Sequence, residues 1–523
     1  MVDMIIMFVL GLMPIIWLII ALCGFKMSGH KAAPIAFVIA VVLAMLVWKM
    51  PAIDAASAAL EGIAMAFWPI ILVIIAAVFT YNLSLHTGMM EIIKRMITSV
   101  SADKRLLVLL VGWCFGGFLE GMAGFGTAIA IPASMLAGLG FNPMFSAIVC
   151  LIANSTPTAF GSIGIPTVTL ANLVGLESTK LAFATTLQLA PLMLITPFIM
   201  VALSGKSIKA IKGVGLVTLI SGVSFVLPQL LVAKFVGAEL PVIVGSVCSL
   251  ICTIMACRVH ESRKAKKGIV DKTYEMKMEA NDERITLKRA LVAWLPFILI
   301  FVLLLMTSNM IPFIHDPLNS IRSAITIYTG PNATPYTFIW VATPGVIIML
   351  SAFIGGLVQK ATFKEMFKVL GETIKQMSKT IITMLAVLAT AKVMGYSGMI
   401  VSIAALFVAL LGTFYPFAAP LIGALGTFVT GSATSSSVLF GNVQIEAASA
   451  IGADPYWLAA ANTMGTAAGK MLSPQSIAIG VAATSLAGKD GEILSKVIKY
   501  AIAFLIIMGF ISYFGMKIWV MFN

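Results

Sequence analysis

The sequence is poor in charged residues. Only 11% of its 523 residues are Asp, Glu, Lys or Arg, and 60% are hydrophobic, whereas soluble domains carry about 25% charged residues. Apolar runs long enough to cross a bilayer, roughly 20 residues each, recur along the whole chain. Their lack of alternation excludes a membrane barrel, so the spans are expected to be helices that satisfy their own backbone groups. We therefore predict an all-α polytopic membrane protein.

Cysteine and histidine are also scarce, with six and four residues. The cysteines lie in or at the ends of apolar runs and form no framework of loop residues, so disulfides and zinc sites are not predicted. The histidines lie in or near the joints between runs, which disfavours a histidine metal site or proton relay. Neither paired aspartates nor a Ser with a His falls inside the spans, as an intramembrane hydrolase would need. We expect no enzyme activity, no metal and no cofactor.

The net charge of +13 lies in short joints between apolar runs. The positive-inside rule explains this pattern better than binding to nucleic acid. The basic joints are predicted to be cytoplasmic: Lys26 and Lys31, Lys94–Arg105, Lys206–Lys212, Arg258–Arg289 and Lys360–Lys379. The N-terminus is then outside a plasma membrane. The first run begins "MVDM" without a basic segment, so we expect a retained helix and no signal peptide.

Uninterrupted spans alternate with two broken regions. The clear spans fall near 4–24, 33–48, 62–82, 182–203, 213–233, 240–257, 290–311, 337–358, 380–395, 398–415 and 496–519. Regions 105–178 and 417–488 are apolar but interrupted every few residues by Gly, Pro, Ser, Thr or Asn, which predicts re-entrant or broken helices. Segments 86–104 and 360–379 are predicted as interfacial helices. The hydrophilic stretch 258–289 is expected to link an N-terminal repeat, 1–257, to a C-terminal repeat, 290–523.

The two broken regions resemble each other. "NSTPTAFGSIGIP" from Asn154 matches "NTMGTAAGKMLSP" from Asn462, and the interval from Asn to Pro is the same, 166 − 154 = 474 − 462 = 12. "GFNPMFSA" pairs with "GADPYWLA" upstream, and "FLEG" at Phe118 pairs with "FVTG" at Phe428. Three pairs in one order favour duplication over coincidence. An odd number of crossings in the first half would invert the second, and paired broken helices indicate a transporter site near the midplane.

Broken helices expose N-terminal amides, which attract a carboxylate without a buried permanent charge. Small polar residues nearby add donors, although they also permit close helix packing. For the serine run 432–437 the two interpretations stay open. The predicted substrate-binding residues are Gly121, Gly124, Asn154, Ser155, Thr156, Thr158, Thr434, Ser435, Ser436, Asn462, Thr463 and Lys470.

Three charges stand in apolar context: Glu120, Lys392 and Lys470. An unpaired charge at a helix centre costs about 2.5–3.5 kcal/mol or more, so each is a functional candidate. A carboxyl group in such surroundings favours its protonated form and can carry a proton. We predict Glu120 and Lys392 as proton-coupling residues, with the lysines able to attract an anion or to pair with the glutamate. Snorkelling of either lysine to an interface is the alternative.

The sequence also resembles a known family. The residues concerned are "FLEGMAGFGTAIAIP" (118–132), "LGFNP" (139–143), "CLIANSTPTAFGSIGIP" (150–166), "VMGYSGM" (393–399), "GALGTFVTGSATSSSVLFGN" (423–442) and "NTMGTAAGKMLSPQSIA" (462–478). Together they are similar to the L-lactate permeases, some of which carry glycolate. The resemblance implies about 12–14 spans and uptake of a 2-hydroxymonocarboxylate with H+.

A weaker similarity links the Asn motifs to dicarboxylate carriers with re-entrant hairpins, which leaves Na+ coupling open. An anion channel also stays open, because glycine-rich re-entrant loops build filters too, but paired inverted sites favour a carrier. We expect a small monocarboxylate and the lipid bilayer as partners, leave a homodimer open, and expect no nucleic acid.

Overall fold

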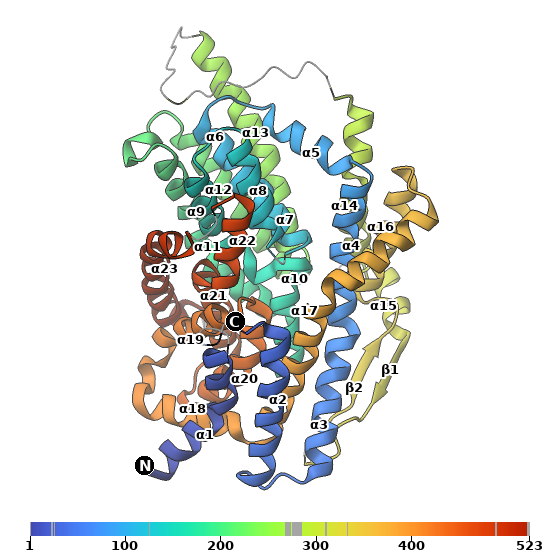
Figure 1. The fold of residues 1–523 in the computed structure, drawn as a ribbon, viewed down its shortest axis with the longest axis vertical. Helices are drawn as coiled ribbons and strands as arrows, with labels where there is room; N and C mark the ends of the chain where they lie inside the picture. The colour runs from blue at the N-terminus through green and yellow to red at the C-terminus, as the bar shows by residue number, and fades with distance from the viewer. Residues whose placement is uncertain are drawn as a thin grey trace.

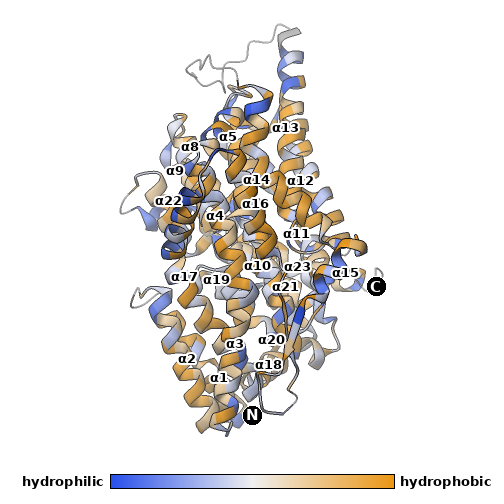
Figure 2. Ribbon diagram, turned by 90° about the vertical axis from the view of Figure 1, so that its right-hand side faces the viewer, coloured by the Kyte–Doolittle hydropathy of each residue, from blue (hydrophilic) through white to orange (hydrophobic). Residues whose placement is uncertain are grey.

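The computed structural model describes residues 2–21, 25, 27–124, 126–266, 274, 285–308, 311–331, 333–486 and 489–519. Among these residues, eleven helices are long and apolar enough to cross a membrane. Hydrophobic residues dominate most of the long helices along their length (Figure 2). The chain is therefore a helical multi-pass membrane protein, as the apolar runs predict.

The first half of the chain supplies the helices α1 (Val2–Ile19), α2 (Gly29–Leu46), α3 (Ala52–Met65), α4 (Leu72–His86), α5 (Met89–Thr98), α6 (Lys104–Leu107), α7 (Gly116–Met122), α8 (Thr127–Gly138), α9 (Pro143–Ser155), α10 (Gly161–Val174), α11 (Ser178–Ser204), α12 (Gly215–Phe235) and α13 (Pro241–Lys266). The second half supplies α14 (Leu287–Met306), α15 (Pro312–Ser320), β1 (Arg322–Ile325), β2 (Tyr336–Ile339), α16 (Pro344–Val358), α17 (Phe363–Ser397), α18 (Met399–Leu411), α19 (Tyr415–Thr430), α20 (Ala433–Ile451), α21 (Pro455–Leu472), α22 (Pro474–Ala483) and α23 (Asp490–Trp519).

Two helical hairpins occupy the broken regions. In hairpin 1, a helical segment from Lys104 to Met122 turns back into α8. In hairpin 2, α19 turns back into α20 at Gly431, which has a left-handed φ of 69°. Hairpin 1 enters from the upper end of the molecule and hairpin 2 from the lower end (Figure 1). The two copies are thus inverted, as the repeat predicts.

Each hairpin is followed by a broken helix. The first consists of α9, a 3-10 turn and α10; the second consists of α21 and α22, separated at Ser473. The matched prolines mark the second half-helix in both copies. Pro474 is the first residue of α22 after its N-cap, where its missing N–H costs nothing. Pro166 follows the break at Ser162–Gly164, whose three φ angles are positive.

Close backbone packing explains why α10 breaks at Gly164. This residue has φ of 76°, and a Cβ there would clash with the Ala238 carbonyl oxygen of the α12–α13 loop. Glycine alone tolerates both the left-handed backbone and the close approach. The break therefore depends on the α12–α13 loop as well as on the local sequence.

Three expected boundaries are wrong. The span predicted over 62–82 is a longer segment, 52–86, in which α3 and α4 are joined across a kink at Trp68, whose φ of −134° and ψ of 118° are not helical. Segment 360–379, predicted as an interfacial helix, forms the first part of the 35-residue helix α17. The span predicted from 337 begins only at Pro344, because the residues before it form β2, which pairs antiparallel with β1 from Arg322↔Ile339 to Ile325↔Tyr336. Most of the predicted linker, 267–273 and 275–284, lies outside the described residues.

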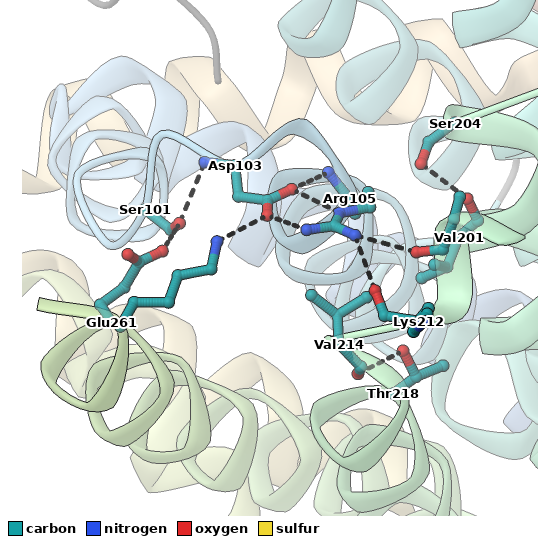
Figure 3. A network of polar contacts seen from close by, with 11 residues as sticks. Ser101, Asp103, Arg105, Val201, Ser204, Lys212, Val214, Thr218 and Glu261 are labelled. Carbon is teal, nitrogen blue, oxygen red and sulfur yellow. Dashed lines mark hydrogen bonds and ion pairs between the residues drawn. The ribbon is translucent and has the colours of Figure 1, made fainter. Parts of the chain in front are cut away.

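A buried polar network joins the basic segments at the upper end of the molecule (Figure 3). Asp103 and Arg105 are each 3% exposed and pair at 2.6 Å. Arg105 also donates to the carbonyl oxygens of Ala210 (3.0 Å) and Lys212 (3.2 Å), and Lys264 of α13 lies 3.7 Å from Asp103. Because the buried charges of Asp103 and Arg105 are paired and hydrogen-bonded within the protein, we interpret the network as structural.

Candidate functional site

A cavity of about 410 Å³ lies where the two hairpins meet the two broken helices. This volume is in the range of small-molecule sites, about 300–1,000 Å³. Six predicted site residues line it: Glu120, Gly124, Thr158, Thr434, Ser435 and Lys470. Residues of α2 and α17 that the sequence did not single out complete the wall, among them Ser28, His30, Lys379 and Thr383.

Glu120 belongs to α7 and is only 3% exposed. Asn154 and Thr158 of the first broken helix lie beside its carboxyl group, yet its Oε2 atom has no hydrogen-bond partner among the residues that the structure describes. A buried carboxylate oxygen without a donor is costly, and a proton or a cationic partner removes part of that cost. The free energy of the buried Glu120 side chain therefore depends strongly on whether it is protonated or paired with a cation.

Gly161, the first residue of α10, packs directly against this carboxyl group. A Cβ on Gly161 would stand 2.6 Å from Glu120 Oε1. We expect Gly161→Ala to displace the carboxylate and to lower the rate of substrate uptake by about tenfold or more. Moving a functional group by about 1 Å can lower a rate by about a hundredfold. Initial uptake per mole of protein in proteoliposomes measures the effect.

Gly138 of α8 provides the matched control, since a Cβ there meets nothing within 4 Å. Gly138→Ala should leave uptake unchanged. Equal uptake by both variants would show that the position of the Glu120 carboxylate does not matter for transport.

Lys470 enters the cavity from the last turn of α21 and is 8% exposed. Its ammonium group donates to the Gly431 carbonyl oxygen at 3.1 Å. That carbonyl ends α19, where the helix dipole favours a cation. Lys470 is also near enough to Glu120 for the two charges to attract each other. The lysine is thus buried and held between the two repeats, and it does not snorkel to an interface.

Three helices begin at the cavity wall. In α20 the N-cap Ser432 accepts from Ser435 N at 3.2 Å, and in α22 the N-cap Ser473 accepts from Ser476 N at 3.1 Å. The third is α2, which starts after Ser28. Helix N-termini carry partial positive charge and free amides, so the cavity is suited to an anion. The start of α2 was missed because no predicted motif covers it.

The Asn462 motif does not form a helix end. Asn462 and Thr463 lie in the middle of α21, fully buried, and the helix continues to Leu472. The reason is packing: Cβ atoms at Gly465 and Gly469 would collide with carbonyl oxygens of α19. Small residues let α19 and α21 approach closely, which favours a continuous helix there.

The other predicted residues lie behind the cavity wall. Three of their hydroxyl groups donate to backbone carbonyl oxygens: Ser155 to Ile152, Thr463 to Ala459 and Ser436 to Gly423. Gly121 packs against the α12–α13 region, where a Cβ would contact Val242 and Ile243. Buried atoms without partners remain on Asn154 (Oδ1), Thr156 (Oγ1) and Asn462 (Nδ2). A direct role of these residues in substrate binding stays a prediction.

Lys392 is not part of the cavity either. Its ammonium group lies 2.8 Å from Glu61 Oε1, and Tyr396 donates to the same oxygen at 2.8 Å. Glu61 is 2% exposed. The sequence reasoning missed Glu61 because the span was predicted to begin at residue 62. The mainly apolar residues from Ala52 to Leu60 could have indicated that the helix begins before Glu61.

Comparison with known proteins agrees with this architecture. A sequence model of the family described as L-lactate permease matches residues 7–519. The chain is 45% identical over 452 residues to an L-lactate permease of Streptococcus iniae, covering 86% of this chain and 93% of that protein. It is 32% identical to the glycolate permease GlcA of Escherichia coli over 96% of this chain and 94% of that protein. The solved structure of Neisseria gonorrhoeae MtrF, from a class of antimetabolite efflux pumps, shares the fold with a TM-score of 0.50 at 13% identity, covering 91% of this chain and 93% of that one.

Proposed function

Because the chain belongs to the L-lactate permease family, we propose that it imports L-lactate, and glycolate as a related substrate, by symport with H+. The observation that carries the proposal is the joint placement of Glu120 and Lys470, both buried, in one cavity between the repeats. Relatives at 45% and 32% identity are named L-lactate and glycolate permeases, which supports the substrate class.

Charge balance explains how a proton and a carboxylate would be coupled. In the empty site, the Glu120 carboxylate and the Lys470 ammonium compensate each other. In the loaded site, Glu120 is protonated and the substrate carboxylate takes its place beside Lys470. Counting Glu120, Lys470, the proton and the substrate, both states are neutral, whereas a proton alone or an anion alone leaves one buried charge unpaired. Unpaired buried charge costs several kcal/mol, about 3–5 when one partner of a pair is lost. Only the empty and the doubly loaded carrier would then cross between the two sides.

The polar wall of the cavity fits the rest of such a substrate. The N-termini of α20 and α22 face the cavity and add to the attraction of the carboxylate. The 2-hydroxyl group would meet Thr158, Thr434 or Ser435, which line the same space. A hydrogen bond to that hydroxyl discriminates against the unsubstituted acid, because the site's own polar group would be left unpaired.

We also propose a plasma-membrane orientation with the N-terminus outside. The start of α1 lies at the lower end of the molecule, and the end of α13 and the start of α14 lie at the upper end (Figure 1). The basic joints 94–105 and 206–212 meet at that upper end in the Arg105 network, which the positive-inside rule assigns to the cytoplasm.

The coupling ion can be tested in proteoliposomes. An inward proton gradient should drive accumulation of labelled L-lactate, and a sodium gradient at equal internal and external pH should not. Unlabelled glycolate should compete. Accumulation driven by a sodium gradient alone would show that the coupling ion is Na+ and not H+. The absence of saturable counterflow would indicate a channel.

A further inference from the structure

A second cavity, of about 480 Å³, lies further along α10 from the first. Pro166 lines the first cavity, whereas Val168 and Asn172 line the second. The α12–α13 loop, which packs against the break at Gly164, forms another part of its wall. A short stretch of α10 therefore separates the two spaces.

Two helices begin at this second cavity without a side-chain cap. Helix α11 starts at Ser178 after Glu177, and helix α16 starts at Pro344 after Thr343; neither N-cap residue makes a side-chain hydrogen bond to its helix. Their first amide groups lack intrahelical acceptors by geometry. Two uncapped N-termini on one cavity favour an anion.

The hydroxyl groups at the same place point to a ligand independently. Thr343 is 4% exposed and lines the cavity, and its Oγ1 has no hydrogen-bond partner among the described residues. The Oγ of Ser178 is also buried and has no partner in the described part of the chain. By contrast, Thr307, which also lines the cavity, already donates to Leu303 O at 2.9 Å. A buried hydroxyl proton without an acceptor is costly, and a bound carboxylate would supply the acceptor.

The titratable groups in the wall of the second cavity are compatible with a bound anion. His315 donates from Nδ1 to the Thr307 carbonyl oxygen at 2.8 Å, since that oxygen can only accept. Glu239 is the acidic residue among the described lining residues, and its carboxyl group is held by backbone N–H groups of its own loop, residues 238 and 239. Burial raises the pKa of the Glu239 carboxyl group and so favours its neutral form, while the N-termini of α11 and α16 remain available.

We propose that this cavity is a second binding site for a small monocarboxylate, with Thr343 and Ser178 as hydroxyl donors. The identification of the anion as the transported substrate rests on the proposed function. The site lies beyond the α10 break from Glu120 and Lys470, so it would hold substrate at a place separate from the first cavity. Binding at the second site does not require the charge pair of the first.

Thiol protection tests the proposal on the purified full-length protein. Asn319 lines the cavity from α15, and the neighbouring Ser320 is exposed outside it. L-Lactate should slow the reaction of Asn319→Cys with a neutral maleimide and leave Ser320→Cys unaffected. The protection should persist when Lys470→Ala is added. Unchanged labelling of Asn319→Cys, or loss of protection with Lys470→Ala, would overturn a separate site.

Two hydroxyl variants and three other anions sharpen the result. Thr343→Val should raise the half-protecting L-lactate concentration about tenfold, as expected for a lost hydrogen bond to a charged group, whereas Thr307→Val should change it little. Glycolate should protect, and chloride and inorganic phosphate should not; equal protection by chloride would refute a carboxylate site. Protection without any gradient-driven uptake would refute the proposed symport and leave this second site intact.

Discussion

Glu120→Gln is expected to abolish L-lactate accumulation driven by a proton gradient and to preserve exchange of labelled for unlabelled L-lactate. Gln resembles protonated Glu in shape and charge, so Lys470 stays available to the substrate carboxylate and the loaded carrier can still cross. The empty carrier then holds an unpaired Lys470 in a site where this residue is only 8% exposed. Its return is blocked by the cost of that buried charge, and net transport stops.

Counterflow and gradient-driven uptake, measured in the same proteoliposomes, separate the two activities. Glu372 lies on the exposed face of α17 and offers the same substitution away from the cavity. Glu372→Gln should accumulate L-lactate normally. Normal accumulation by Glu120→Gln would remove Glu120 from the coupling mechanism, and loss of both activities would assign it to substrate binding instead.

Lys392→Met is expected to destabilise the protein strongly, whereas Glu61→Leu combined with Lys392→Met should restore most of the stability. The single change leaves Glu61 buried, 2% exposed, with only Tyr396 as a donor. Breaking a buried ion pair from one side costs about 3–5 kcal/mol, while replacing both partners with apolar residues is often neutral. The apparent melting temperature in detergent measures both effects.

The same variants decide what Lys392 does. If the double variant regains both stability and proton-driven accumulation, the pair is structural and Lys392 has no part in coupling. Stability without accumulation would support the coupling role predicted from the sequence. Lys496→Met is the control: it removes a pair with Glu492 of 2.6 Å in which both side chains are 47% exposed, and exposed pairs contribute little.

Much of the fold could be predicted from local sequence. Apolar runs of sufficient length determine spanning helices, because lipid offers no partner for free backbone groups. Pro474 does begin α22, since proline removes a donor that a helix start does not need, and Pro166 follows the break inside α10. The inverted repeat was readable because both copies keep these local breaks in register.

The site was only partly predictable. Glu120 and Lys470 stood out because a lone charge in an apolar run is costly wherever it lies. The sequence did not show that the two residues, 470 − 120 = 350 positions apart, share a cavity. It also suggested a helix end at Asn462, where the glycines of α21 pack against α19 and keep the helix continuous.

By itself, then, the sequence determined that the chain spans a membrane with helices, that two regions hold broken helices, and that Glu120, Lys392 and Lys470 are too costly to be incidental. Each of these depends on a residue and its near neighbours. The tertiary structure alone decided that Lys392 pairs with Glu61 and that Lys470 faces Glu120. It also placed α11 and α16 with uncapped N-termini on a second cavity. Charge pairing and cavities arise between segments remote in the chain, so they follow from packing and not from local pattern.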